Sequence, residues 1–320
     1  MGNRLESEEG LGEFFDYVRT EKIQSFYNEY YARAQKSRVH SEFCRLVYGH
    51  DFCQHGMLDM SQLDKLIEVA QLRQNGLVLE LGCGTGFMAE YISDKTQCQT
   101  VGIDISSAAI ALARARAQSG KKKLIFETKD IEKLDYPERH FDAVISIDTL
   151  YFVEDLENAI RRMAKILKPD GFMYIFYHVH PDVGRGSDPA SRSPLGVVLA
   201  RLRLTYRTLD LTKENREHWE LRREVLLKLK KKFEEEDNMF LYNTRMDEYM
   251  QNFGEYHRFL YIVEKDPSMQ RRSHSRRAME PHPAEGDGGS PPGSRRIDLR
   301  LRYGRSMRPM GPRSRRRTQR

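Results

Sequence analysis

The segment Leu77–Gly86 reads LVLELGCGTG, and it decides the fold class. Its first half is apolar except for Glu80, which is the pattern of a strand buried on both faces. Its second half places glycines at alternate positions, namely Gly82, Gly84 and Gly86. A buried strand followed by a glycine-rich turn and a helix lets an open α/β sheet bind a ligand with its backbone. The segment therefore predicts an α/β fold with a ligand site after this strand.

The spacing of the glycines and the neighbouring acid narrow the class of ligand. A dinucleotide fingerprint, G-x-G-x-x-G, needs a third glycine at the position where Phe87 stands. Glu80 would repel a pyrophosphate at the helix N-terminus, whereas it suits a ligand that carries an ammonium or sulfonium group. From these residues alone, an ordinary glycine-rich turn is the alternative.

At these residues the chain resembles the class I S-adenosylmethionine (SAM)-dependent methyltransferases, whose first motif is an acid followed by G-x-G-x-G. The resemblance covers residues 77–177 well and residues 200–265 by architecture. It implies a Rossmann-like, doubly wound seven-stranded sheet with an antiparallel edge strand, and SAM as the cofactor. It also implies that the following residues bind this cofactor: Glu80, Gly82, Cys83, Gly84 and Gly86.

Two further strands end in candidates for the adenosine part of the cofactor. Asp104 ends the strand at 100–104 and lies 22 residues beyond Gly82. At about that distance an acid accepts hydrogen bonds from ribose hydroxyls, and Ile105 follows it; capping of the next helix is the alternative. After the strand at 124–128, the resemblance implies that Asp130 bonds the adenine amino group and that Ile131 helps to hold the ring.

The fourth and fifth strands end in the candidates for catalysis. In the family that the chain resembles, the turn after strand 141–146 contacts the methionine part of the cofactor and faces the acceptor. The resemblance therefore implies that Ser146 and Ile147 bind the cofactor and that Asp148 and Tyr151 are candidates for catalysis. For Tyr151, packing is the alternative. His178 follows the strand at 172–177 and is a candidate general base, since its unperturbed pKa lies near neutrality. Many methyl transfers need no base.

A helical stripe at 156–167 precedes that last strand and ends at Lys168–Gly171, which is predicted to form a turn.

The chain is predicted to form three regions. Residues 1–72 have a helical pattern; these helices could simply cover one face of the sheet, whereas the resemblance implies a lid over the cofactor and substrate. Residues 73–266 form the cofactor-binding domain, with a helical insertion at 213–253 before a last strand. Residues 267–320 contain 15 Arg, no Lys and 4 acids, with few aliphatic residues, so we predict a disordered tail. In the lid, the resemblance implies a Tyr that reaches the cofactor, with Tyr30 and Tyr31 as candidates. His55 either lines the pocket or caps a helix.

The charge distribution and the cysteines limit which partners and which cellular compartment the sequence predicts. Outside the tail the chain carries 38 basic and 43 acidic residues, which disfavours nucleic-acid binding by the folded part. The tail either binds RNA or an acidic partner by charge or has no function of its own. The four cysteines have no zinc-site spacing, so we predict no metal. Sparse unpaired cysteines, no signal peptide and no long apolar stretch predict a cytoplasmic protein without a membrane span.

The predicted function is methyl transfer from SAM to a small molecule by in-line displacement. One alternative is a methyltransferase of RNA or protein that docks through the tail. Because the fourth strand continues as Ser-Ile-Asp-Thr rather than as an Asn/Asp-Pro-Pro-Tyr motif, this alternative is weaker. A second alternative is a non-catalytic module that binds SAM. The oligomeric state and the atom that receives the methyl group are not predicted.

Overall fold

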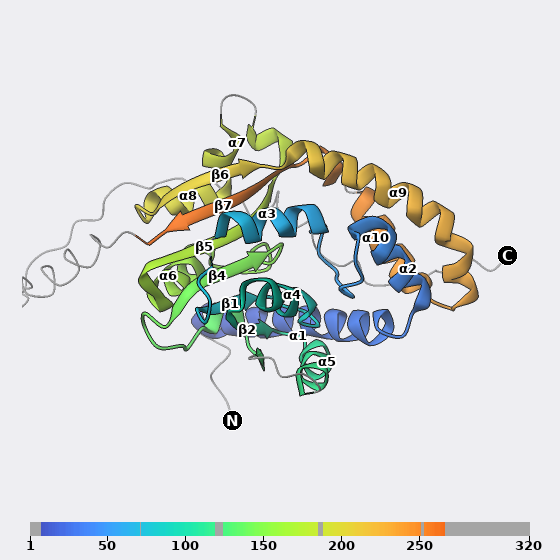
Figure 1. Ribbon diagram of the computed structural model, residues 1–320, viewed down its shortest axis with the longest axis horizontal. Helices are drawn as coiled ribbons and strands as arrows, with labels where there is room; N and C mark the ends of the chain where they lie inside the picture. The colour runs from blue at the N-terminus through green and yellow to red at the C-terminus, as the bar shows by residue number, and fades with distance from the viewer. Residues whose placement is uncertain (1–7, 71, 119–123, 185–187, 251–252, 266–320) are drawn as a thin grey trace, which may run out of the picture.

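In the described part of the chain, seven strands form one sheet in the order β3-β2-β1-β4-β5-β7-β6 (Figure 1). The computed structural model describes residues 8–70, 72–118, 124–184, 188–250 and 253–265. β1 to β5 pair in parallel, and β7 lies antiparallel between β5 and β6. The predicted fold class is confirmed, whereas the tail at 267–320 lies outside the described residues. The strands are β1 (Leu77–Leu81), β2 (Gln99–Asp104), β3 (Leu124–Thr128), β4 (Phe141–Ile147), β5 (Leu167–Val179), β6 (Thr205–Asp210) and β7 (His257–Glu264).

Helices cover both faces of the sheet, each with an apolar side. α6 packs Ile160 and Met163 into the core on one face, and Asp155 begins this helix by accepting a hydrogen bond from the backbone N of Asn158 (2.9 Å). α3 and α4 pack Leu66 and Ile92 into the core on the other face. The helices are α1 (Glu8–Ala34), α2 (Arg38–Tyr48), α3 (Met60–Ala70), α4 (Phe87–Thr96), α5 (Ser107–Gln118), α6 (Leu156–Ile166), α7 (Pro189–Arg192), α8 (Pro194–Arg201), α9 (Thr212–Glu235) and α10 (Met239–Met250).

The turn predicted at Lys168–Gly171 is wrong, because these residues belong to β5. The register shifts at this point: Phe141 pairs with Leu167, but Ala143 pairs with Phe172. Asp142, between the two paired residues of β4, accepts a hydrogen bond from Lys168 Nζ (2.7 Å). The polar and proline-containing segment is therefore accommodated as an irregularity in the strand.

A helical lobe lies beside the sheet and combines the predicted lid with the predicted insertion. Figure 1 shows α9 running away from the sheet, with α10 and α2 next to it. Side chains from α1, α2, α9 and α10 share one apolar core, which includes Tyr30, Phe43, Leu226, Phe233 and Leu241. Segments from the two ends of the described chain therefore form one structural unit. None of the helices in the described ranges is both long enough and apolar enough to span a bilayer.

Candidate functional site

The glycine-rich loop after β1 is closely approached by other parts of the chain. Gly82 and Gly84 have φ angles of 69° and 52°, the left-handed region that favours glycine. A Cβ atom at Gly84 would lie 2.5 Å from the Tyr31 hydroxyl, and one at Gly82 would lie 2.5 Å from the side chain of Thr149. Glycine is therefore required here both for the backbone conformation and for the space that α1 and Thr149 occupy.

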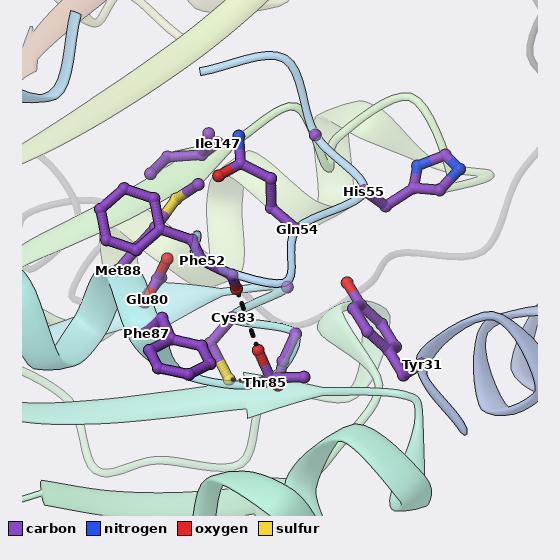
Figure 2. Close-up of a pocket in the computed structure, with 13 residues that line it drawn as sticks. Tyr31, Phe52, Gln54, His55, Glu80, Cys83, Thr85, Phe87, Met88 and Ile147 are labelled. Carbon is purple, nitrogen blue, oxygen red and sulfur yellow. Dashed lines mark hydrogen bonds between the residues drawn. The ribbon is translucent and has the colours of Figure 1, made fainter. Parts of the chain in front are cut away.

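A pocket lies over this loop, beneath the segment that joins α2 to α3 (Figure 2). We call residues 49–59 the 49–59 loop. Thr85 Oγ1 donates a hydrogen bond to the Phe52 carbonyl (3.2 Å), which ties the 49–59 loop to the glycine-rich loop. The pocket is thus built from the sheet, the helical lid and the segment between two lid helices. Its lining comprises Tyr31, Phe52, Gln54, His55, Gly56, Glu80, Gly82, Cys83, Gly84, Thr85, Phe87, Met88 and Ile147.

Two buried oxygen atoms in this pocket have no hydrogen-bond partner in the described part of the chain: Glu80 Oε2 and Gln54 Oε1. Glu80 is 2% exposed, and its burial, with the charge of Asp104 nearby, raises its pKa to about 8. An unsatisfied buried acceptor costs about 1–3 kcal/mol. The arrangement therefore favours a ligand that donates hydrogen bonds, and a cation would restore the charged form of Glu80.

Asp104 lies at the end of β2, next to the pocket, and is held by backbone donors. Its carboxylate accepts hydrogen bonds from the backbone N of Gly84 and of Ser106, both at 2.8 Å. Burial raises the pKa of Asp104 to about 6, although both hydrogen bonds oppose the shift. α1 crosses this edge of the sheet, because Gln24 Nε2 donates to the Ile105 carbonyl (2.8 Å) and Ser106 Oγ donates to Asn28 Oδ1 (2.7 Å).

A buried ion pair lies on the other side of the pocket, after β4. Arg258 from β7 donates to both carboxylate oxygens of Asp148, at 2.7 and 3.0 Å, and its Nε donates to Gln62 Oε1 (2.7 Å). Asp148 Oδ2 also accepts a hydrogen bond from the backbone N of Met57 (3.1 Å), in the 49–59 loop. Burial alone would raise the pKa of Asp148, but the charge of Arg258 and the hydrogen bonds hold it well below its usual range.

The predicted base His178 belongs to the same network. Its Nε2 lies 2.9 Å from Asn215 Oδ1, and its Nδ1 lies 3.0 Å from Arg258 Nη1. These contacts fit a neutral imidazole that donates through Nε2 and accepts through Nδ1. Burial and the charge of Arg258 lower the pKa of His178, and its backbone N donates to the Tyr151 hydroxyl (2.5 Å). The three catalytic candidates, Asp148, Tyr151 and His178, are therefore brought together with Arg258.

Residues 79–175 match a family model described as a methyltransferase domain. With the acid and glycine-rich loop at their start, these residues form a class I SAM-dependent methyltransferase domain. The chain is 33% identical over 131 residues to the phosphoethanolamine N-methyltransferase of Plasmodium falciparum. The matched residues make up 40% of this chain and 48% of that protein. It is 32% identical over 108 residues to the ajmaline N-methyltransferase of Rauvolfia serpentina, or 33% and 37% of the two chains. The chain thus spans less than half the length of either relative.

Two solved structures share the fold of this chain at low identity. Phosphoethanolamine N-methyltransferase 2 of Haemonchus contortus has a TM-score of 0.60 at 18% identity, over 75% of this chain and 60% of that chain. The cyclase SpnF has the same TM-score and identity over 77% of this chain and 96% of that chain. Because the fold carries both a methyltransferase and a cyclase, the reaction has to be argued from the site.

The methyltransferase domain and its lid bring part of the predicted cofactor set into the pocket. Tyr30 and Tyr31 are both buried in the core of the helical lobe, but of the two it is Tyr31 that lines the pocket. The predicted cofactor-binding residues that line the pocket are Tyr31, His55, Glu80, Gly82, Cys83, Gly84 and Ile147.

The remaining predicted cofactor residues are not among those that line this pocket. Gly86 begins α4, and Asp130 accepts a hydrogen bond from the backbone N of Glu132 (2.9 Å), which begins a short turn at Ile131–Lys133. Ser146 is fully buried, and its Oγ has no partner among the described residues. The cofactor-binding and catalytic roles given to all these residues stay predictions.

Several residues of this site were not found from the sequence pattern. Gln54 stands beside His55 in a polar break between helices, where only His55 was predicted to line the pocket. Thr149 follows the acidic candidate Asp148 directly. Arg258 is the second residue of β7 and directly precedes its apolar run, and a cation next to such a run signals a buried partner. Arg245 has no comparable signal, because many charged residues surround it in the insertion.

Proposed function

We propose that this chain transfers a methyl group from SAM to a small-molecule acceptor. The observation that carries the proposal is the pair of unsatisfied buried acceptors, Glu80 Oε2 and Gln54 Oε1, in a pocket over the glycine-rich loop. An α-ammonium group has the positive charge and the N–H donors that these two oxygen atoms require. The residues present therefore fit the amino-acid end of SAM.

The adenosine end of the cofactor would be held at the carboxyl ends of β2 and β3. Asp104 has the carboxylate that accepts hydrogen bonds from ribose hydroxyls, and it already orients the glycine-rich loop through Gly84. Asp130 and Ile131 stand at the corresponding end of β3, where we propose that they hold the adenine. Ser146 and Ile147 at the end of β4 would face the methionine part.

When bound, SAM supplies an electrophilic methyl group on a sulfonium. The chain then has to hold an acceptor atom in line with this methyl group and to exclude water, and such positioning supplies much of the catalysis. The 49–59 loop and Tyr31 line the pocket, and we propose that they exclude water from it. We propose that Asp148 and Tyr151 face the acceptor. His178 would act on a proton only if it exchanges one of its present hydrogen-bond partners.

The proposed acceptor is a small molecule, as it is for the phosphoethanolamine and ajmaline enzymes. The phosphoethanolamine and ajmaline enzymes are N-methyltransferases, so small amines are the first acceptors to test. Calorimetry of the full chain with SAM, S-adenosylhomocysteine and NAD tests the cofactor. Binding of NAD without binding of SAM would contradict the proposal, and release of S-adenosylhomocysteine in an acceptor screen separates an enzyme from a non-catalytic module.

We expect Asp104→Asn to weaken SAM binding by about tenfold or more, because hydrogen bonds to a charged group are worth about 1.5–3 kcal/mol each. The amide keeps a carbonyl oxygen for one backbone donor, so the loop retains part of its support. Calorimetry measures the dissociation constant, and Asp64→Asn on the exposed face of α3 serves as the control. Equal affinities of Asp104→Asn and the unmodified chain would show that the ribose assignment is wrong.

A further inference from the structure

A single buried arginine joins the helical insertion to the wall of the cofactor pocket. Arg245 lies on α10 and is 1% exposed. Its Nη1 donates to the His55 carbonyl (2.5 Å), and its Nη2 donates to the Gln54 carbonyl and to the Tyr30 hydroxyl. The same guanidinium group therefore contacts α1 and two consecutive residues of the 49–59 loop.

These contacts fix the backbone of the loop rather than any particular side chain. The Gln54 carbonyl receives a second hydrogen bond from the Tyr30 hydroxyl (3.1 Å), so Arg245 and Tyr30 hold it together. The carboxamide of Gln54 then extends into the pocket, where its Nε2 donates to the Leu58 carbonyl (2.6 Å) and its Oε1 has no partner in the described ranges (Figure 2). The position of the unsatisfied Oε1 thus depends on where Arg245 holds the backbone.

Arg245 is itself held rigidly, as a positioning group requires. Its guanidinium carbon lies 5.5 Å from the ring centroid of Tyr30 and 5.7 Å from that of Phe43, within the range of cation–π attraction. The fork of donors on a guanidinium matches several acceptors in a fixed geometry, whereas a lysine ammonium does not. An arginine in this place can therefore hold two carbonyls and a hydroxyl at once.

We propose that Arg245 is a positioning residue that shapes the cofactor pocket from the insertion without touching the cofactor. The proposal rests on the proposed function for the identity of the ligand, but not for the effect on the loop. It implies that the insertion sets SAM affinity through the 49–59 loop. By linkage, any acceptor that stabilises the docked insertion would raise SAM affinity, and SAM would raise acceptor affinity by the same factor.

The test compares Arg245→Gln, Arg245→Lys and Tyr30→Phe with the unmodified full chain. We expect the SAM dissociation constant to rise about tenfold in Arg245→Gln and about threefold in Arg245→Lys and in Tyr30→Phe, since one neutral hydrogen bond contributes about 0.5–1.5 kcal/mol. We expect kcat at saturating SAM to stay within about twofold, because no group that contacts the reacting atoms has changed. A purely structural role would lower kcat, or the fraction of folded protein, without changing the affinity of the folded form.

Hydrogen exchange without SAM gives a second readout that is independent of the ligand. Amides of the 49–59 loop should exchange faster in Arg245→Gln, while those of β1 and β4 keep their protection. Lys231→Gln is the control, because it removes a positive charge from the same insertion at a side chain that is 86% exposed, and its Nζ lies 3.7 Å from Glu235 Oε1 of the same helix. It should leave exchange in the loop unchanged.

Each outcome decides the proposal. Unchanged SAM affinity in Arg245→Gln, or a loss of kcat at unchanged affinity, would overturn it. If Arg245→Gln does not fold, unchanged affinity in both Arg245→Lys and Tyr30→Phe would overturn it. If the unmodified chain does not bind SAM, the proposed function fails, but faster loop exchange in Arg245→Gln would still support the positioning role.

Discussion

Arg258→Ala should lower the free energy of unfolding by about 3–5 kcal/mol, the usual cost of removing one partner of a buried ion pair. Arg258 is fully buried and makes two hydrogen bonds to Asp148 and one to Gln62. Among the described residues, its loss would leave the buried Asp148 carboxylate with only the backbone N of Met57 and the neighbouring His178. Urea unfolding of the full chain measures the change.

The pH dependence of this loss identifies its cause. In the unmodified chain the lowered pKa of Asp148 contributes stability that is present above the unfolded pKa, about 3.9, and is lost as the pH falls through the folded pKa. Without Arg258, burial raises the pKa of Asp148, so the destabilisation should shrink as the pH falls and the carboxyl becomes neutral. A loss that is independent of pH would instead indicate a packing defect.

Two further variants test whether the loss of stability in Arg258→Ala comes from the buried charge. Arg258→Met combined with Asp148→Asn removes both charges, and we expect it to recover a large part of the stability, because the desolvation penalty disappears with the pair. Arg201→Ala breaks an exposed ion pair with Glu157 (2.8 Å) and should cost less than about 1 kcal/mol. A similar loss in Arg201→Ala and Arg258→Ala would contradict the burial argument.

The sheet could be predicted from the sequence because each strand carries its own local pattern. The apolar run that ends in glycines at Leu77–Gly86 and the stripe of the helix at 156–167 define their elements without reference to the rest of the chain. The irregularity at Lys168–Gly171 could not be predicted. Proline and glycine indicate a turn locally, but pairing with β4 and the contact between Lys168 and Asp142 keep this segment in the strand.

The site was harder to predict, because its polar groups meet across long sequence separations. Asp104 could be placed from its distance to the glycines, since both lie in one βαβ unit. Arg258 and Asp148 are 110 residues apart, and Arg245 contacts the carbonyl of Gln54 across 191 residues. No spacing rule connects such positions. The sequence could therefore supply the candidates Asp148, Tyr151 and His178, but not the arginine that neutralises the first and engages the last.

The affinity for SAM should rise by about tenfold per pH unit between pH 6.5 and pH 7.5, because binding an ammonium group beside Glu80 requires the carboxylate form. Burial raises the pKa of Glu80 to about 8, so this side chain is mostly protonated at neutral pH without a ligand. Ionisation on binding then releases one proton. The range begins above the pKa of Asp104, about 6, and ends below about pH 7.7, the pKa at which an α-amino group of a peptide has lost half of its charge.

Glu80→Gln separates this effect from every other titration. The amide cannot ionise, so we expect its SAM affinity to be nearly independent of pH in this range and to resemble that of the unmodified chain at the acidic end. Calorimetry in two buffers of different ionisation enthalpy counts the released proton directly, and the count should approach one for the unmodified chain and zero for Glu80→Gln.

The pH dependence of the stability of the ligand-free chain tests the sign of the same effect. A raised pKa contributes stability below the unfolded value of about 4.5 that is lost as the pH rises through about 8. SAM should therefore stabilise the chain more at pH 7.5 than at pH 6.5, and the reverse order would show that the ammonium group does not lie beside Glu80.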